Sequence, residues 1–450
     1  MSDFEAVVGR VSERVDPTAE ERRALAAAAG RLADRARDAI ANLPVDAEVV
    51  QVGSTARGTW VAGDRDIDLF VQFPSDLPRE DLEAYGLEVG KAVLPDGHEE
   101  YAEHPYVKGE FEGYDVDLVP CYGVENATAI QSAVDRTPFH NEYLLERLDD
   151  DLAGDVRLFK QFLKGVGVYG SDLRTQGFSG YLAELLVVEY GGFRATLAAA
   201  QDWRPPVVLD PEDHQAAEFD DPLVVVDPTD PERNVAAVVS ETNVATLQHH
   251  ARTFLEDPDE DAFEPADREP LDEEALRAHL ERRATTPLAV VFDAPDLVED
   301  QLYPQLYRSR DGLVRGLREY GFQVLRSATW ADGRAVLFVE LSVAELPAVE
   351  RHVGPPVHVE DHARGFYEKY AADDDAYGPF VDDGRYVVER DREVRTAHEF
   401  ARDRLDEVAL GAHVASLVAE ADYEVLVGGE VASLVSEFGK GFAAYFEPNA

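Results

Sequence analysis

Three aspartates alternate with other residues where a short apolar strand begins, and this pattern limits what the chain can fold into. The sequence GSTARGTW (53–60) runs directly into VAGDRDIDLFVQF (61–73). Successive side chains of a strand point to opposite faces, so Asp64, Asp66 and Asp68 share one face and the apolar residues between them share the other. We expect the apolar face to be buried and the acidic face to line a site.

A later segment, GYDVDLVPCY (113–122), repeats the pattern with Asp115 and Asp117 on one face. Carboxylates held this close raise each other's pKa unless a cation lies between them. Their hard oxygen atoms are ligands that suit Mg²⁺. Two acids from one strand and one from another predict a two-metal platform, which stabilises the attacking and leaving oxygens of an in-line phosphoryl displacement.

The turn before the first strand supplies the other half of the predicted site. Gly53 permits a tight bend, Ser54 can donate hydrogen bonds, and Arg57 follows about one helical turn later. Backbone N–H groups at a helix start bind phosphates, so we expect a nucleoside triphosphate here. Alternating acids can also form a solvated edge in a chain this acidic. The combination of turn, acidic strand and later acid favours the site.

The charge of the chain is extreme. It carries 91 acidic and 42 basic residues, a net charge of −49, and six lysines. This composition resembles that of proteins from a molar-salt cytoplasm, where the Debye length is about 3 Å. The alternative is an acidic protein that avoids nucleic acid. Under the salt interpretation, acidity does not argue against an RNA partner.

The 450 residues are enough for about three domains. The chain has no apolar run of about 20 residues that would span a membrane, and its N-terminus lacks the apolar run of a signal peptide. The single cysteine, Cys121, suits a reducing cytoplasm and a small core position. We therefore predict a cytoplasmic protein without a membrane partner.

Hydrophobic periodicity predicts mixed strands and helices in the first 120 residues and mostly helices over 140–200. We expect helices over 17–42 and 78–93, strands over 47–53 and 66–73, and a hairpin over 106–122. Further on, we expect a strand and then a helix (NVAAVVS, 234–240), and a linker over 255–276.

The C-terminal part gives a strand (287–295), a helix (302–321), a hairpin around Asp332-Gly333 and another helix (342–353). This order, β-α-β-β-α, is similar to a ferredoxin-like or RNA-recognition-type fold.

The joint pattern of GSTARGTWVAGDRDIDLF resembles the signature of the polymerase-β-type nucleotidyltransferases. Further segments narrow the resemblance to the class I, archaeal-type CCA-adding enzymes: HPYVKGEFEGYDVDLVPCY, SAVDRTPFHNEYL, VRLFKQFLKGVGVYGSD, GFSGYLAELL and DPTDPERNVAA. The similarity runs from about residue 40 to 245. It implies an α+β multidomain protein with a nucleotidyltransferase head (1–140), a helical neck that recognises the nucleotide base (141–256), and a ferredoxin-like or RRM-like body and tail that bind tRNA (277–450).

The resemblance also implies residue roles. Asp66, Asp68 and Asp117 would be the catalytic metal ligands, although other members have glutamate at the first position, and Asp117 would lie nearest the attacking oxygen. Residues implied to contact the nucleotide are Ser54, Arg57, Thr137, His140, Lys160, Tyr169 and Arg233. Lys160 would lie with Arg157 and Lys164 on the helix face opposite a buried stripe, which is ordinarily a solvated face. Arg233, at a predicted helix start, would read the base.

The implied activity is addition of C, C and A to the 3′ end of tRNA from CTP and ATP with Mg²⁺, without a template and with release of pyrophosphate. Whether the chain forms a homodimer is left open. The rival enzymes are a poly(A) polymerase and a small-molecule nucleotidylating enzyme; about 300 residues beyond the head disfavour the latter. A rival of another class is a catalytically idle RNA-binding scaffold, which need not keep three carboxylates that repel each other.

Overall fold

The structure, a computed structural model, describes residues 3–448. The chain divides into two compact units, of which the first ends at Ala266 and the second begins at Asp267. The predicted head and neck both fall within the first unit, and a border between them at residue 140 stays a prediction. Among the described residues, no helix has the length and apolar character needed to cross a membrane.

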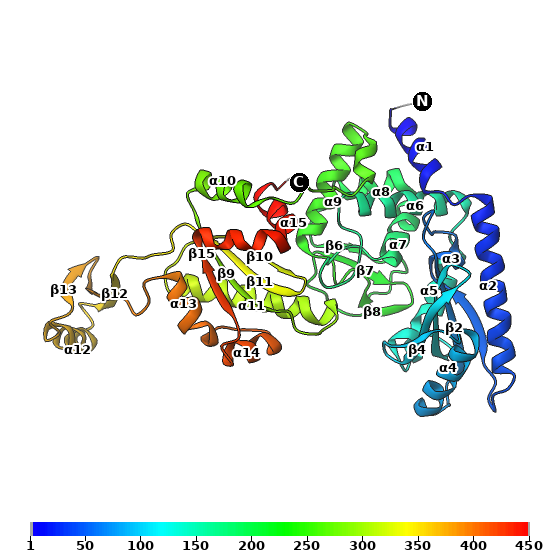
Figure 1. The fold of residues 1–450 in the computed structure, drawn as a ribbon, viewed down its shortest axis with the longest axis horizontal. Helices are drawn as coiled ribbons and strands as arrows, with labels where there is room; N and C mark the ends of the chain where they lie inside the picture. The colour runs from blue at the N-terminus through cyan, green and yellow to red at the C-terminus, as the bar shows by residue number, and fades with distance from the viewer. Residues whose placement is uncertain (1–2, 449–450) are drawn as a thin grey trace. The chain divides into compact units, whose positions relative to one another are not determined.

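A five-stranded sheet with the order β1-β2-β5-β4-β3 forms the first part of the first unit (Figure 1). Strands β2 and β5 are parallel neighbours, and the other pairs are antiparallel. The sequence predicted β1, β2 and the hairpin of β4 and β5, whereas β3 was missed. The strands are β1 (Glu48–Val52), β2 (Asp66–Pro74), β3 (His98–Tyr101), β4 (Pro105–Phe111) and β5 (Tyr114–Gly123).

Two predicted helices, α2 (Ala19–Ile40) and α4 (Arg79–Val93), pack on the apolar face of this sheet. Helix α4 approaches the strands closely because Gly90 carries no side chain; a Cβ atom there would lie 2.4 Å from Cγ2 of Val107. The opposite face holds the aspartates and a smaller buried group that includes Phe70 and Cys121, so the predicted core position of Cys121 is confirmed.

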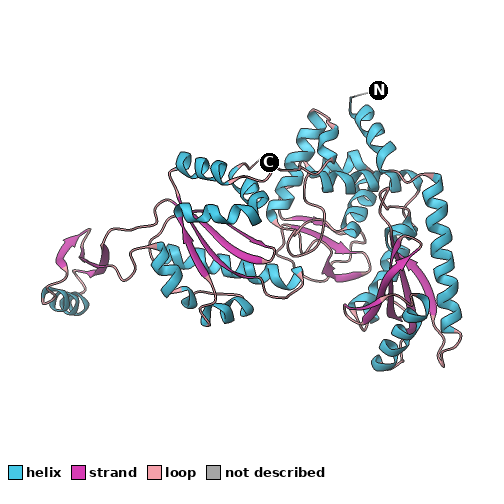
Figure 2. Ribbon diagram, viewed as in Figure 1, coloured by secondary structure: helices cyan, strands magenta, loops and turns pink. Residues whose placement is uncertain are grey.

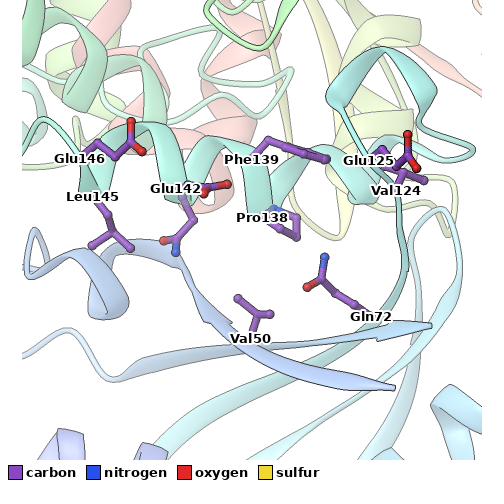
Figure 3. A pocket seen from close by; sticks show the side chains of 10 residues that line it. Val50, Gln72, Val124, Glu125, Pro138, Phe139, Glu142, Leu145 and Glu146 are labelled. Atoms are coloured by element: carbon purple, nitrogen blue, oxygen red, sulfur yellow. The ribbon is translucent and has the colours of Figure 1, made fainter. Parts of the chain in front are cut away.

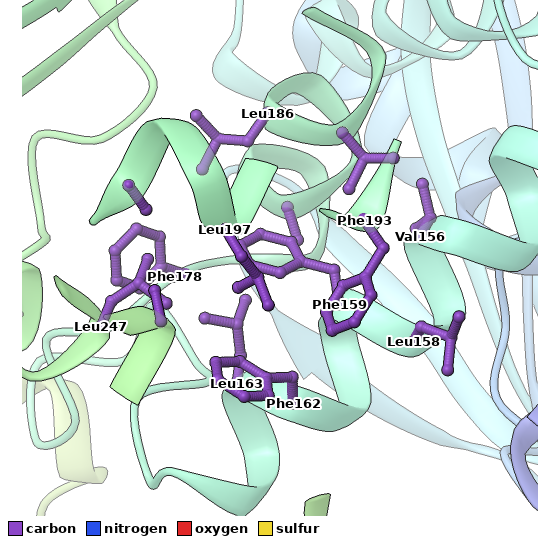
Figure 4. Close-up of a cluster of buried hydrophobic side chains, with 14 of the residues drawn as sticks. Val156, Leu158, Phe159, Phe162, Leu163, Phe178, Leu186, Phe193, Leu197 and Leu247 are labelled. Carbon is purple, nitrogen blue, oxygen red and sulfur yellow. The ribbon is translucent and has the colours of Figure 1, made fainter. Parts of the chain in front are cut away.

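The helices that follow share one core with the N-terminal helix α1, which packs on α6. Figure 4 shows its aromatic and aliphatic side chains, including Phe162 and Phe193, gathered between these helices. The helices of this core are α1 (Asp3–Val15), α5 (Thr137–Leu145), α6 (Asp150–Gly165), α7 (Gly180–Tyr190), α8 (Phe193–Ala200) and α9 (Glu241–Glu256). The short helix α3 (Gly53–Arg57) lies between β1 and β2 in the chain and contacts both strands.

One expectation for this region was wrong, and another holds for only part of its range. Residues 235–238 form a turn and 239–240 are irregular, so no helix is present there. The preceding residues form strand β8 (Asp230–Asn234) in a small sheet with β6 (Val207–Leu209) and β7 (Leu223–Asp227). The expected linker over 255–276 is partly structured. A short 3₁₀ helix (Glu260–Phe263) places Phe263 in the core of the first unit, since that side chain is fully buried.

The second unit is built on a four-stranded antiparallel sheet with the order β10-β11-β9-β15. Helices α10 and α15 cover one face, and α11, α13 and α14 cover the other (Figure 2). The expected strand, helix and hairpin are all present. The elements are α10 (Glu273–Arg283), β9 (Thr286–Asp293), α11 (Glu299–Glu319), β10 (Val324–Ala331), β11 (Arg334–Leu341), α13 (Ala397–Asp403), α14 (Ala412–Ala419), β15 (Glu424–Val427) and α15 (Val435–Phe446).

A three-stranded sheet with the order β12-β14-β13 is inserted between β11 and α13. It consists of β12 (Val349–Pro356), β13 (Tyr377–Asp382) and β14 (Arg385–Asp391), with helix α12 (Glu360–Ala371) packed against it. The expected helix over 342–353 is therefore wrong. Pro347 disfavours helical backbone at the residue before it, and β12 pairs with β14 instead.

Candidate active site

The aspartates of β2 and β5 lie side by side on one face of the first sheet. The two strands are parallel, and their register places Asp66 opposite Asp115 and Asp68 opposite Asp117. Side chains at opposed positions of neighbouring strands point to the same face. The expected row of carboxylates is therefore present, and its opposed members are 49 residues apart in the sequence.

These carboxylates disturb each other's ionisation. Burial, together with the charges of Asp117 and Asp66, raises the pKa of Asp68 to about 6. Burial and the charges of Asp64 and Asp115 also raise the pKa of Asp66. Both shifts favour the protonated carboxyl. A cation bound between these groups would relieve the repulsion between the carboxylates and would be attracted by their negative charges.

Gly53 fixes the position of one carboxylate. Its φ of +79° lies in the left-handed region, and a Cβ atom there would lie 2.0 Å from Oδ2 of Asp68. The short helix α3 begins at this residue, with Ser54 in its first turn. The turn and the acidic strand therefore touch, as the sequence predicted, and only glycine allows the carboxylate to lie against the backbone at this point.

Arg57 and Lys160 meet at a buried carboxylate, Glu184, which is not among the predicted site residues. Arg57 donates from Nε at 2.8 Å and lies 2.7 Å away through Nη2, and Lys160 donates from Nζ at 2.7 Å. Thr59 donates its hydroxyl to the same side chain. Burial by itself raises the pKa of Glu184, but the charges of Lys160 and Arg57 outweigh it and hold this pKa below its usual value.

The face of α6 that carries the basic residues is not solvated, in agreement with the presence of two of the six lysines on it. Arg157 and Lys160 are 3% and 4% exposed, so α6 is buried on nearly all sides. Arg157 donates to Asp16 at 2.6 Å and to the carbonyl of Gly58, which ties α6 to the turn after α3. The hydroxyl of Tyr169 and the ammonium group of Lys160 both lie close to Gly180. A Cβ atom at Gly180 would be 3.1 Å from the Tyr169 hydroxyl and 3.7 Å from Nζ of Lys160.

A second cluster surrounds the fully buried Asp227 at the end of β7. Its Oδ2 lies 2.7 Å from Nε2 of His140 and 2.7 Å from Nη1 of Arg233. The His140 ring stacks on Tyr181 with centroids 4.1 Å apart. Burial alone would raise the pKa of Asp227, but hydrogen bonds from His140 and Thr229 hold it far below its usual value. Arg233 lies on β8 rather than at a helix start.

Helix α5 begins at Thr137 and links these groups to the turn. Asn141, one helical turn further along, accepts a hydrogen bond from Nη1 of Arg57 at 2.9 Å and donates to the carbonyl of Gln51. His140 and Asn141 are neighbours on this helix, so α5 contacts both the Asp227 cluster and α3. Helix α5 thus joins Thr137 and His140, which it carries, to Arg57.

A cavity beside the sheet does not hold these residues. It has a volume of about 650 Å³ and lies between β1, β2 and α5, where Val50, Gln72, Phe139 and Glu142 line it (Figure 3). Its charged lining residues are all glutamates, which repel phosphate. None of the predicted site residues lines it, and we assign it no role in nucleotide binding.

The donor chemistry of the acidic row fits a hard divalent cation. Asp66, Asp68 and Asp117 supply carboxylate oxygens alone, and Oδ1 of Asp117 is buried without a well-aligned hydrogen bond from any described residue. Within residues 3–448, however, no three acidic, histidine or cysteine side chains are already converged as a ligand set. Asp117 is instead paired with Lys108, whose Nζ lies 3.2 Å from Oδ1.

The sheet, its acidic row and the adjoining turn define the chain as a nucleotidyltransferase, and comparisons with known proteins agree. Residues 33–140 match the nucleotidyltransferase domain family. Residues 154–264 match "tRNA nucleotidyltransferase, second domain", and residues 283–428 match "CCA-adding enzyme, C-terminal domain".

Full-length relatives make the assignment more specific. The chain is 74% identical to a CCA-adding enzyme of Halobacterium salinarum, with all of both chains covered. It is 44% identical to one of Methanosarcina barkeri over 92% of each chain. A solved structure of a cytoplasmic RNA terminal U-transferase is similar at 16% identity and a TM-score of 0.46, covering 60% of this chain and all of that one. The chain belongs to the CCA-adding enzymes, as its sequence motifs predicted.

Proposed function

We propose that this chain adds C, C and A in turn to the 3′ end of tRNA, with CTP and ATP as substrates and no nucleic-acid template. The 3′-hydroxyl oxygen of the RNA forms a bond to the α-phosphorus of the nucleotide. The bond from the α-phosphorus to the oxygen that bridges it to the β-phosphate breaks in line, pyrophosphate leaves with that oxygen, and the hydroxyl proton is released to solvent. All three additions would use the same acidic row.

The observation that carries this proposal is the alignment of Asp66 and Asp68 with the acids of β5 beside Gly53. A solvated strand edge would not require a glycine at the one position where a side chain would strike Asp68. A catalytically idle scaffold would gain nothing from carboxylates that raise each other's pKa. The full-length identity to CCA-adding enzymes favours CCA addition over the related nucleotidyl transfers.

We assign the triphosphate to the cluster of Ser54, Arg57, Lys160 and Tyr169. Two cations share one carboxylate there, so this group of three side chains carries one excess positive charge beside the end of α3. Burial strengthens the attraction of this charge for phosphate, since little water screens it. Glu184 fixes both cations before the nucleotide arrives, which reduces the ordering cost of binding.

We assign the nucleoside to Thr137, His140 and Arg233. Asp227 holds the imidazole and the guanidinium in place through two contacts of 2.7 Å. A fixed guanidinium fork distinguishes acceptor patterns on a base edge, which is the chemistry that separates C and A from U and G. The side chain of Arg233 is 37% exposed, so part of the fork is free to reach a ligand.

We propose Mg²⁺ as the cation, held by Asp66, Asp68 and Asp117. When bound, it would neutralise charge on the attacking and leaving oxygens. Asp117 would lie nearest the RNA hydroxyl.

We propose the head, neck and C-terminal domains with borders at 1–140, 141–256 and 277–450. The element order of the second unit supports a ferredoxin-like body, since the strands and helices follow β-α-β-β-α-β once the inserted sheet is set aside. The body and tail would recognise tRNA by the shape of its A-form helix. We place the reaction in the cytoplasm.

The experiment that tests the proposal offers the protein tRNA lacking its CCA end with each labelled NTP separately and in combination. We expect CTP to add two residues, ATP to add one only after CTP, and UTP and GTP to add none. Long A tails from ATP alone would support a poly(A) polymerase instead. Binding of tRNA without any incorporation at molar KCl would support the idle scaffold.

A further inference from the structure

Lys108 completes a row of charged side chains across three strands. On β4 it lies opposite Asp117 of β5, which in turn lies opposite Asp68 of β2. All three side chains therefore point to the same face of the sheet. Lys108 is one of six lysines in a chain with 91 acidic residues, and it lies beside the proposed metal ligands.

The ammonium group of Lys108 contacts both oxygens of Asp117. Its Nζ lies 3.2 Å from Oδ1 and 3.5 Å from Oδ2. The Lys108 side chain is 42% exposed, so its ammonium can move into water without crossing the core. The Asp117 carboxylate is more buried, at 27% exposed, and has no such freedom. The lysine is therefore the more exposed partner of this pair.

We infer that Lys108 is a positioning residue that holds Asp117 while no divalent cation is bound and competes with the cation for this carboxylate. The inference rests on the proposed metal ligands. A divalent cation bound to Asp117 would repel an ammonium group that contacts the same oxygens. The cation and the Lys108 ammonium group therefore cannot both stay on this carboxylate. Lys108 thus lowers the affinity of the free enzyme for its metal and keeps the acidic row partly neutralised before substrates bind.

The test measures Mn²⁺ binding to the full chain by the electron paramagnetic resonance signal of the free ion, without nucleotide or tRNA and at fixed molar KCl. We expect Lys108→Met to bind Mn²⁺ roughly three- to tenfold more tightly than the wild type, the scale of one partly exposed charge pair. Lys108→Arg keeps the charge and should keep the wild-type affinity. The matched control is Lys91→Met, which removes an exposed ammonium paired with Glu99 elsewhere in the same sheet domain.

Unchanged or weaker Mn²⁺ binding by folded Lys108→Met would overturn the inference, as would equal tightening in Lys91→Met. Lys108→Gln provides a second neutral variant, and thermal unfolding confirms that each variant is folded. Asp68→Asn and Asp117→Asn separate this result from the proposed function. If they abolish Mn²⁺ binding while Lys108→Met changes nothing, the lysine inference alone fails. If they bind Mn²⁺ as the wild type does, the proposed ligands fail, and the inference fails with them.

Discussion

At the scale of single residues, the arrangement of the acidic face depends on the absence of a side chain at Gly53 and on the register of two strands. Gly53 has no side chain to strike Asp68, and the register of β2 with β5 brings acids from two distant segments into one row. Period-2 alternation was enough to predict the face of each aspartate, because a strand offers only two faces. The pairing of Lys108 with Asp117 was not predictable in this way, since it depends on the register of β4.

Asp117→Ala should abolish incorporation of both CTP and ATP while leaving tRNA binding largely intact, because one acidic row serves every addition. Single-turnover incorporation on tRNA ending before, within and after the two C residues measures this, and tRNA binding is followed by filter retention. If the variant still added C but not A, two separate catalytic sites would be required.

Arg233→Ala should loosen base choice more than it slows nucleotidyl transfer. The guanidinium is held by Asp227 and keeps donors free, and a well-placed bidentate contact contributes about 1–3 kcal/mol of discrimination. The measurement is the ratio of UTP and GTP incorporation to that of CTP and ATP. Arg136→Ala is the matched control, since Arg136 pairs with Asp230 at 2.7 Å in the same region. An unchanged nucleotide preference with full activity would reassign Arg233 to a structural role.

At the scale of helices and strands, a single carboxylate joins three elements. Glu184 on α7 accepts hydrogen bonds from Arg57 on α3 and Lys160 on α6. An acid within the apolar run of α7 was the sequence signal that could have identified it, because a buried carboxylate needs a partner of opposite charge. The identity of those partners depended on tertiary packing, which no local pattern contains.

Glu184→Gln should destabilise the first unit by about 3–5 kcal/mol, because it leaves two buried cations without a counter-charge. Denaturant unfolding of the full chain at molar KCl measures the change as a lower midpoint of the first transition. Glu189→Gln, on the same helix but only partly buried, is the control and should change stability by less than about 1 kcal/mol. Equal effects of the two substitutions would show that Glu184 has no special role in the cluster.

The two wrongly predicted helices show where sequence patterns fail. Residues 234–240 are apolar enough for a helix, but the side chain of Asn234 accepts hydrogen bonds from the backbone N–H groups of Val225 and Ala236 and holds a turn. The sequence also predicts a helix over 342–353. In the structure, Leu346 instead donates its N–H to the carbonyl of Arg395. In both cases a contact with a distant residue outweighs a weak local preference.

At the scale of the whole molecule, basic residues are few relative to acidic ones, and most of the lysines are paired with carboxylates. Five of the six lysines contact carboxylates: Lys91, Lys108, Lys160, Lys164 and Lys440. Composition alone predicted the excess of acid, whereas the pairing required the structure. A protein with 91 acidic and only 42 basic residues is not expected to bind RNA mainly through the release of counterions from phosphates.

Folding and CCA addition should therefore both strengthen as KCl rises toward the molar range, opposite to the usual trend for RNA-binding proteins. At low ionic strength the net charge of −49 repels both itself and tRNA. At about 1 M salt this repulsion is screened to about 3 Å, while contacts through shape, stacking and metal-bridged phosphates persist. Activity and the thermal midpoint across a KCl series at fixed Mg²⁺ measure the effect. A maximum of activity below roughly 0.2 M, where ordinary phosphate contacts dominate, would contradict the salt interpretation and leave the acidic composition to be explained by something other than a molar-salt cytoplasm.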